Sequence, residues 1–104
     1  MLKAALDRSA DAKLRDAAAR SIRMWTVALI GDDRFERVVV TEEPCADPEC
    51  PPAETWIDLL GSKEGDRRLR IPRPMRYVGA DDVALAVRAF LAGAPDPSAS
   101  DSCC

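Results

Sequence analysis

The chain has 104 residues, a formal net charge of −3 and no histidine. This is the length of one ordinary domain, which can bury a core without needing disulfides to fold. The acidic balance argues against a dedicated nucleic-acid binder, and the lack of imidazole excludes Ser-His and Cys-His catalysis within one chain. We expect no nucleic-acid partner; whether the protein is an enzyme stays open, with the balance against it.

We expect neither a signal peptide nor a membrane span. The N-terminal residues lack the uninterrupted apolar stretch of about 7 to 15 residues that a signal peptide carries. The most apolar run, residues 24–30, is shorter than the roughly 20 residues that a helix needs to cross a bilayer. The sequence thus predicts a cytoplasmic protein with no membrane partner. In a reducing compartment, closely spaced cysteines are more often metal-binding, redox-active or unmodified than permanently bridged.

The first predicted element is a long helix over residues 2–30. It is rich in alanine and ends before Gly31, a residue type that commonly follows the last turn of a helix. In an alternative, Ser9 caps a shorter helix and residues 1–8 are frayed. Trp25 is expected to anchor the packing of this helix. The stripe expected to face the core consists of Leu14, Ala18, Ile22, Trp25 and Leu29.

Three strand candidates follow, recognised by β-branched or alternating residues. Residues 38–41 form a β-branched run, and residues 55–60 carry apolar groups on both faces. Residues 61–66 have the glycine and polar content of a hairpin loop, and alternation over residues 68–71 indicates the returning strand. A second amphipathic helix begins near residue 81, and its apolar stripe consists of Val83, Val87, Phe90 and Leu91.

These elements predict an α+β fold: a small three-stranded, mostly antiparallel sheet with an N-terminal and a C-terminal helix packed on one face. We expect residues 1–93 to form a single domain. Residues 94–102 contain no large apolar side chain and cannot offset the entropy of ordering by burial. Residues 94–104 are therefore expected to form a flexible tail that ends in a dithiol, Cys103 and Cys104.

Cys45 and Cys50 are the first candidate site residues. They follow the valine-rich strand in a segment whose backbone is restricted by several prolines. The C-x4-C spacing lies within the range of two to four intervening residues typical of structural zinc ligands, and without histidine a transition-metal site must use thiolates and carboxylates. We predict a metal site at Cys45 and Cys50, with Cys103 and Cys104 as auxiliary or delivery ligands. Zinc is favoured by abundance and Cu(I) by the thiol-only chemistry; no organic cofactor is expected.

Thiol redox chemistry is the alternative use of these cysteines. Cys45 and Cys50 would form a disulfide if the segment brought their Cα atoms within about 7 Å, and the pair could then exchange with the tail. Acidic residues around the segment disfavour a reactive thiolate, whereas a bound cation reverses that penalty. This surround favours metal binding over redox chemistry. The acidic residues are Glu42, Glu43, Asp47, Glu49 and Glu54.

A cluster of arginines is the second candidate site. Its members are Arg67, Arg68, Arg70, Arg73 and Arg76. Guanidinium groups hold oxyanions bidentately, so the cluster is a candidate surface for an acidic partner or for phosphate groups. In the alternative interpretation, Arg68 and Arg70 lie on the solvent face of a strand and pair with the acidic segment, within one chain or between subunits.

The middle of the chain resembles a group of small uncharacterised bacterial proteins. They share a strand ending near T-E-x-x-C, a C-x4-C-P-P-x-E-T turn, and a later strand that leads through a proline into a helix. In this chain the turn runs from Cys45 to Thr55 and the resemblance covers residues 36–91, leaving the dithiol tail outside. Some members are labelled nitrate-reductase related, but the chain lacks the size and cofactor-binding elements of a molybdenum enzyme. The resemblance implies that the Cys-Pro-Pro turn is a family feature with a link to metal handling.

The leading hypothesis is a small cytoplasmic accessory protein that binds a soft or borderline metal ion through cysteine thiolates. A dithiol redox protein or redox substrate is the second hypothesis. The third is a protein-interaction module that docks a larger enzyme through its sheet and arginines, with the thiols incidental. The expected partner is accordingly a protein, either a metal acceptor or a larger enzyme, and the oligomeric state does not follow from the sequence.

Overall fold

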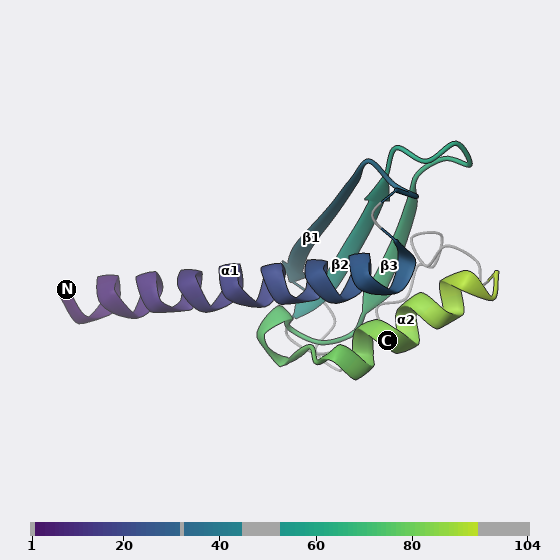
Figure 1. Ribbon diagram of the computed structural model, residues 1–104. Helices are drawn as coiled ribbons and strands as arrows, with labels where there is room; N and C mark the ends of the chain where they lie inside the picture. Colours follow the sequence, from purple (N-terminus) through teal and green to yellow (C-terminus); the bar gives the residue numbers. More distant parts are fainter. Residues whose placement is uncertain (1, 32, 45–52, 94–104) are drawn as a thin grey trace.

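The computed structural model describes residues 2–31, 33–44 and 53–93, with the side chains of the first helix described from residue 12 on. The strands form one antiparallel sheet in the order β1-β2-β3, and both helices pack on one of its faces (Figure 1). The predicted α+β fold is confirmed. In chain order the elements are α1 (Leu2–Ile30), β1 (Arg37–Pro44), β2 (Ala53–Leu60), β3 (Arg67–Ile71), the 3-10 helix η1 (Met75–Tyr77) and α2 (Ala80–Leu91).

The sheet is a meander whose two faces follow from side-chain alternation. β1 pairs with β2 over all eight residues of each strand, and β3 pairs with residues 55–59 of β2. Since successive side chains point to opposite faces, one set meets the helices and the other lies on what we call the open face. The charged and aromatic side chains of the open face are Arg37, Glu43, Glu54, Trp56, Asp58, Arg68 and Arg70.

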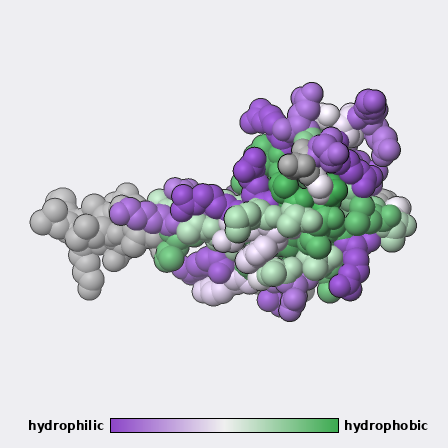
Figure 2. Space-filling view, viewed as in Figure 1, coloured by the Kyte–Doolittle hydropathy of each residue, from purple (hydrophilic) through white to green (hydrophobic). Residues whose placement is uncertain are grey.

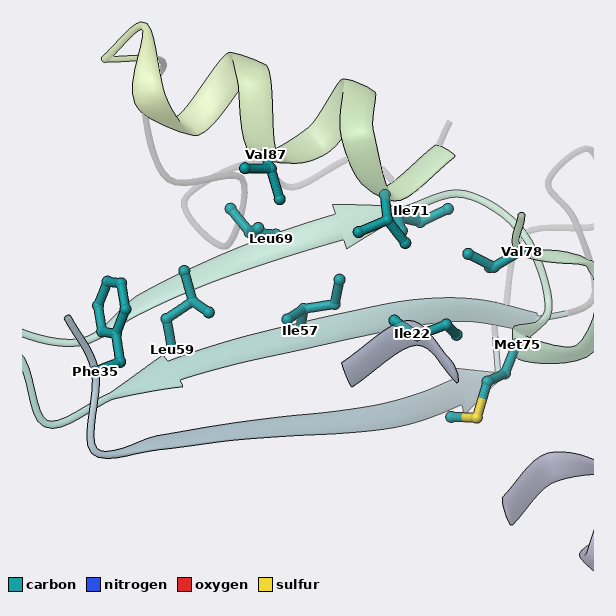
Figure 3. Close-up of a cluster of buried hydrophobic side chains, with 10 residues drawn as sticks. Ile22, Phe35, Ile57, Leu59, Leu69, Ile71, Met75, Val78 and Val87 are labelled. Carbon is teal, nitrogen blue, oxygen red and sulfur yellow. The ribbon is translucent and has the colours of Figure 1, made fainter. Parts of the chain in front are cut away.

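The core lies between the sheet and the two helices (Figure 3). Ile57 and Leu59 of β2 and Ile22 of α1 have no exposed area, and Val87 of α2 is 2% exposed. Full burial of an aliphatic side chain contributes about 1.5–3 kcal/mol. The hydrophobic residues of the central strand and the two helices therefore hold the layers together.

α1 packs on the sheet through its second half. Ile22 and Thr26 are fully buried, and Thr26 Oγ1 donates a hydrogen bond to the Ile22 carbonyl oxygen (2.7 Å). The predicted core stripe is confirmed in its middle but wrong at both ends, because Leu14 and Leu29 are 56% and 48% exposed. Leu14 lies before the part of the helix that reaches the sheet. At the other end, Ile30 packs against the core in place of Leu29.

The first half of α1 extends away from the other elements, past the β1 side of the sheet (Figure 1). A helix of 29 residues is about 43 Å long, which accounts for most of the 49 Å longest dimension of the molecule. The helix begins at Leu2, so the alternative start near Ser9 is wrong. The side chains of residues 12–17 are all exposed. We call residues 2–17 the projecting segment.

Candidate functional site

The segment 45–52 connects two strand ends that are paired with each other. Pro44 and Ala53, which flank this segment, are register partners across β1 and β2. The segment therefore belongs to a hairpin connection at one end of the sheet. The predicted metal ligands Cys45, Cys50, Cys103 and Cys104 all lie outside the described residues, so the metal site stays a prediction.

On the open face, Arg68 of β3 reaches across β2 to β1. Its Nε donates a hydrogen bond to Asp58 Oδ1 (2.9 Å), and its Nη2 donates one to Glu43 Oε1 (3.0 Å). The guanidinium carbon lies 4.1 Å from the ring centroid of Trp56, which is a cation–π arrangement. Trp56 is only 7% exposed although it lies on the face opposite to the helices. The guanidinium group of Arg68 therefore helps to cover the indole ring of Trp56 on this face.

Arg70 and Glu54 form a second, more buried pair on the same face. Arg70 Nε donates a hydrogen bond to Glu54 Oε2 (2.6 Å), and Trp56 Nε1 donates one to Glu54 Oε1 (3.1 Å). The side chains of Arg70 and Glu54 are 18% and 12% exposed. Burying a charge is costly unless the charge is paired, so each of these two groups depends on the other.

The described carboxylates near the cysteine segment are engaged in contacts within the chain. Glu43 and Glu54 are register partners whose like charges would repel, and each is neutralised by a different arginine of β3. Glu42, on the helix-covered face, accepts a hydrogen bond from the Met75 backbone N–H (2.7 Å). The acidic surround therefore supports metal binding over redox chemistry less strongly than its sequence suggests.

The predicted arginine cluster is divided between the two faces of the sheet. Arg68 and Arg70 are held in ion pairs on the open face, as the alternative interpretation expected. Arg67 lies on the helix-covered face, where its guanidinium carbon is 5.2 Å from the ring centroid of Phe90. These three guanidinium groups stabilise the fold, which limits their use in docking a partner.

Arg73 and Arg76 follow the sheet and are both exposed. Arg73 Nη1 lies 3.7 Å from Asp82 Oδ2, and the Arg76 guanidinium carbon lies 5.0 Å from the ring centroid of Tyr77. Docking through these two arginines stays a prediction. Arg73, but not Arg76, lines a shallow hollow of about 470 Å³ that carries both signs of charge. The lining residues are Arg73, Tyr77, Gly79, Ala80, Asp81 and Asp82.

α1 carries a second stripe on the side away from the core. Leu14 and Met24 are 56% and 67% exposed, and two alanines between and after them are also exposed. Successive members of this set are separated alternately by three and four residues, which is the spacing of residues through which one helix packs against another. We call this set the α1 stripe; its members are Leu14, Ala17, Ser21, Met24 and Ala28.

Exposed charged side chains in the described part of α1 are mostly basic, and two of them, Lys13 and Arg20, neighbour members of the α1 stripe three or four residues away. Residues 12–30 include four exposed basic side chains and one exposed acidic side chain, a net charge of +3, whereas the whole chain has a net charge of −3. The five residues are Lys13, Arg15, Asp16, Arg20 and Arg23. Figure 2 shows hydrophilic side chains along the described part of α1, with hydrophobic groups among them. The three- and four-residue spacing of the α1 stripe is visible in the sequence. Leu14, however, fits both the α1 stripe and the stripe predicted to face the core, so the sequence alone assigns Leu14 to the core.

The chain matches no model of a known protein family, no curated protein and no solved structure. The resemblance to small bacterial proteins stays a prediction. Among the helices in the described ranges, none combines the length and the apolar character needed to cross a bilayer. Within the same ranges, no three cysteine or carboxylate side chains lie together as metal ligands would.

Proposed function

We propose that the protein is a cytoplasmic interaction module, an accessory protein that docks another protein through the α1 stripe. The observation that carries this proposal is the exposure of Leu14 and Met24 on a helix that extends beyond its own domain. Amphipathic helices bind apolar grooves of partner proteins through anchors at this spacing. Lys13 and Arg20, which neighbour the stripe on the helix surface, suit a groove with an acidic rim.

The projecting segment is suited to docking because its own domain gives it little packing. Its described side chains, residues 12–17, are all exposed. Packing of an apolar face against the rest of the protein normally supplies most of the stability of a helix, and the projecting segment has little such packing. Alanine-rich sequence keeps the helix formed at low cost. Leu14 and Met24 are 56% and 67% exposed, so a partner that buries them would gain about 1–2 kcal/mol for each, before the cost of association.

A photo-crosslinking amino acid placed at position 14 or 24 in the native host tests this proposal. We expect both positions to form the same protein adducts, identified by mass spectrometry. Position 85 is the matched control, because Leu85 is 69% exposed but lies on α2. A Lys13→Glu, Arg20→Glu variant should weaken the adducts if the partner groove is acidic. Adducts at 14 and 24 no stronger than at 85 would eliminate docking through the stripe.

Thiolate metal binding at Cys45 and Cys50 is a second proposal, and one observation favours it. The segment that carries both cysteines begins and ends at register partners of two paired strands. Both thiols therefore belong to one connection with a fixed base, which lowers the entropy cost of bringing two ligands together. Zinc and Cu(I) are the proposed ions, with Cys103 and Cys104 as further ligands that pass the ion to a partner protein.

Native mass spectrometry of anaerobically purified protein, with and without added Zn²⁺ or Cu⁺, tests the metal proposal. We expect a stoichiometric adduct that a Cys45→Ser, Cys50→Ser variant loses. The matched control is Cys103→Ser, Cys104→Ser, which should weaken the adduct but not abolish it. Retention of the adduct in the first variant would eliminate the site. A reversible loss of about two hydrogens in a glutathione titration, without any metal adduct, would instead support dithiol redox chemistry.

A further inference from the structure

β1 is a long and regular edge strand. Its eight residues pair with β2 on one side in an unbroken register, and within the described ranges no strand pairs with its other side. Such an edge presents a row of unpaired N–H and C=O groups, which proteins often protect with central charges, proline or a bulge. The middle of β1 instead reads Val38, Val39, Val40, and its charges and proline lie towards the ends. This edge is therefore suited to pairing with another strand.

We infer that two copies of this chain pair through β1 in antiparallel fashion and form one six-stranded sheet. A two-fold axis perpendicular to the sheet relates two such strands, so one residue must pair with its own copy. When that residue is Val40, Arg37 of each copy lies opposite Glu43 of the other. Both belong to the open face, so their side chains meet on the same side of the joined sheet. Opposite charges in such cross-strand positions stabilise the pairing.

The neighbouring registers lack this charge complementarity. Centring the axis on Val39 places Arg37 opposite Thr41 of the second copy. Centring it on Thr41 places Glu43 opposite Val39 of the second copy. The Val40 register pairs residues 37–43 with one another, so it also uses nearly the whole strand.

The two charged groups are accessible to a second copy. Arg37 is exposed, and no ion pair joins it to another residue of the described ranges. Glu43 binds Arg68 through one carboxylate oxygen, but its side chain is still 48% exposed. A carboxylate can accept hydrogen bonds from two guanidinium groups at once. Dimer formation would therefore give Arg37 an ion pair with Glu43 of the second copy, and Glu43 could keep its ion pair with Arg68.

The proposed dimer goes beyond docking through the α1 stripe. A two-fold axis perpendicular to the sheet keeps both helical layers on one face of the joined sheet. Because α1 runs past the β1 side of the sheet (Figure 1), each projecting segment then extends towards the second copy. The α1 stripe lies on the side of the helix away from the core, so the contact between the two β1 strands does not involve it. One dimer would present two such stripes in the same direction, which allows bivalent docking.

Sedimentation velocity of the full-length chain over a concentration series, with all thiols kept reduced, tests the dimer. We expect a reversible dimer whose dissociation constant rises about tenfold or more in Arg37→Glu and in Glu43→Arg, because two symmetric ion pairs become repulsive in each. An equimolar mixture of the two variants should restore the dimer, since each cross-strand position then again joins opposite charges.

Two controls separate this proposal from folding defects and from the proposed function. Circular dichroism and thermal unfolding check Glu43→Arg, which also loses the contact with Arg68, whereas Arg37→Glu loses no described ion pair. A Leu14→Glu, Met24→Glu variant should abolish crosslinking to other proteins and leave the dimer unchanged. A chain that stays monomeric at the highest attainable concentration overturns the inference. So does a dimer that neither charge reversal weakens, or one that the mixture does not restore.

Discussion

Glu54 accepts hydrogen bonds from two side chains, so replacing it with alanine removes the partner of both. The Arg70 contact of 2.6 Å is a charge-assisted bond, worth about 1.5–3 kcal/mol, and the indole bond from Trp56 adds about 0.5–1.5 kcal/mol. Arg70 keeps 18% of its side chain exposed, so water recovers part of this loss. We expect the free energy of unfolding to fall by about 3 kcal/mol, as is typical when one partner of a largely buried ion pair is removed.

Urea unfolding followed by circular dichroism measures this change. With a denaturant slope of about 1–3 kcal/mol/M, the unfolding midpoint should fall by roughly 1 to 3 M. Glu43 is the matched control, because it is the register partner of Glu54 on the same face and also binds an arginine, but its side chain is 48% exposed. Glu43→Ala should lower the free energy of unfolding by less than about 1 kcal/mol, as exposed ion pairs do.

A double-mutant cycle with Arg70→Ala separates the pair interaction from other effects of each substitution. The combined variant should lose less stability than the sum of the two single variants, because removing both charges leaves neither unpaired. If Glu54→Ala and Glu43→Ala lowered the free energy of unfolding equally, or if the cycle showed no coupling between Glu54 and Arg70, burial would not set the strength of this ion pair.

Three further substitutions test packing, backbone conformation and stacking. Ile57→Ala, at a position without exposed area, should lower the free energy of unfolding by about 3 kcal/mol in a urea titration; a loss below about 1 kcal/mol would contradict its place in the core. Gly61→Ala should lower the thermal midpoint more than Gly65→Ala. Both glycines have positive φ (82° and 102°), but a Cβ at Gly61 would lie 2.7 Å from a glutamate Cβ, whereas nothing lies within 4 Å at Gly65; equal shifts would show that this contact is unimportant. Arg68→Ala should move the fluorescence of Trp56 to longer wavelength in a variant whose other tryptophan is phenylalanine, and an unchanged spectrum would mean that the guanidinium does not cover the ring.

Most of the sheet can be predicted from the sequence, because the alternation of polar and apolar residues and the glycine-containing loop at residues 61–66 both indicate a hairpin of β2 and β3. Arg68 and Arg70 alternate with buried residues in β3, and the glycine-containing loop before them sets the hairpin. The strands are nevertheless longer than predicted, since β1 continues to Pro44 and β2 begins at Ala53. Proline is tolerated at the end of an edge strand. The cross-strand contact of Glu54 with β3 also stabilises this end, and it exists only once the register is formed.

α1 and the ion pairs could not be predicted in the same way. In an alanine-rich helix, spacings of three and four residues define more than one stripe, and the few large side chains decide which of them packs. Ile22 reaches the core and Leu14 does not, because the helix extends beyond the sheet. The sequence likewise places arginines near carboxylates. Which arginine pairs with which carboxylate depends on the strand register, and the burial of each pair depends on the packing around it. Both are defined only in the folded sheet.

The proposed dimer and the proposed metal site constrain each other. In the Val40 register, Pro44 of one copy lies opposite Glu36 of the other, so the two Pro44 residues are separated by roughly 27 Å, or eight positions at 3.4 Å each. Cys45 directly follows Pro44, and consecutive Cα atoms are only about 3.8 Å apart. The Cys45 thiolates of the two copies therefore cannot bind one ion, because a zinc–sulfur bond is only about 2.3 Å long. A dimer paired through β1 would bind one ion per copy, so an ion shared by the Cys45 thiolates of two chains would be incompatible with this interface.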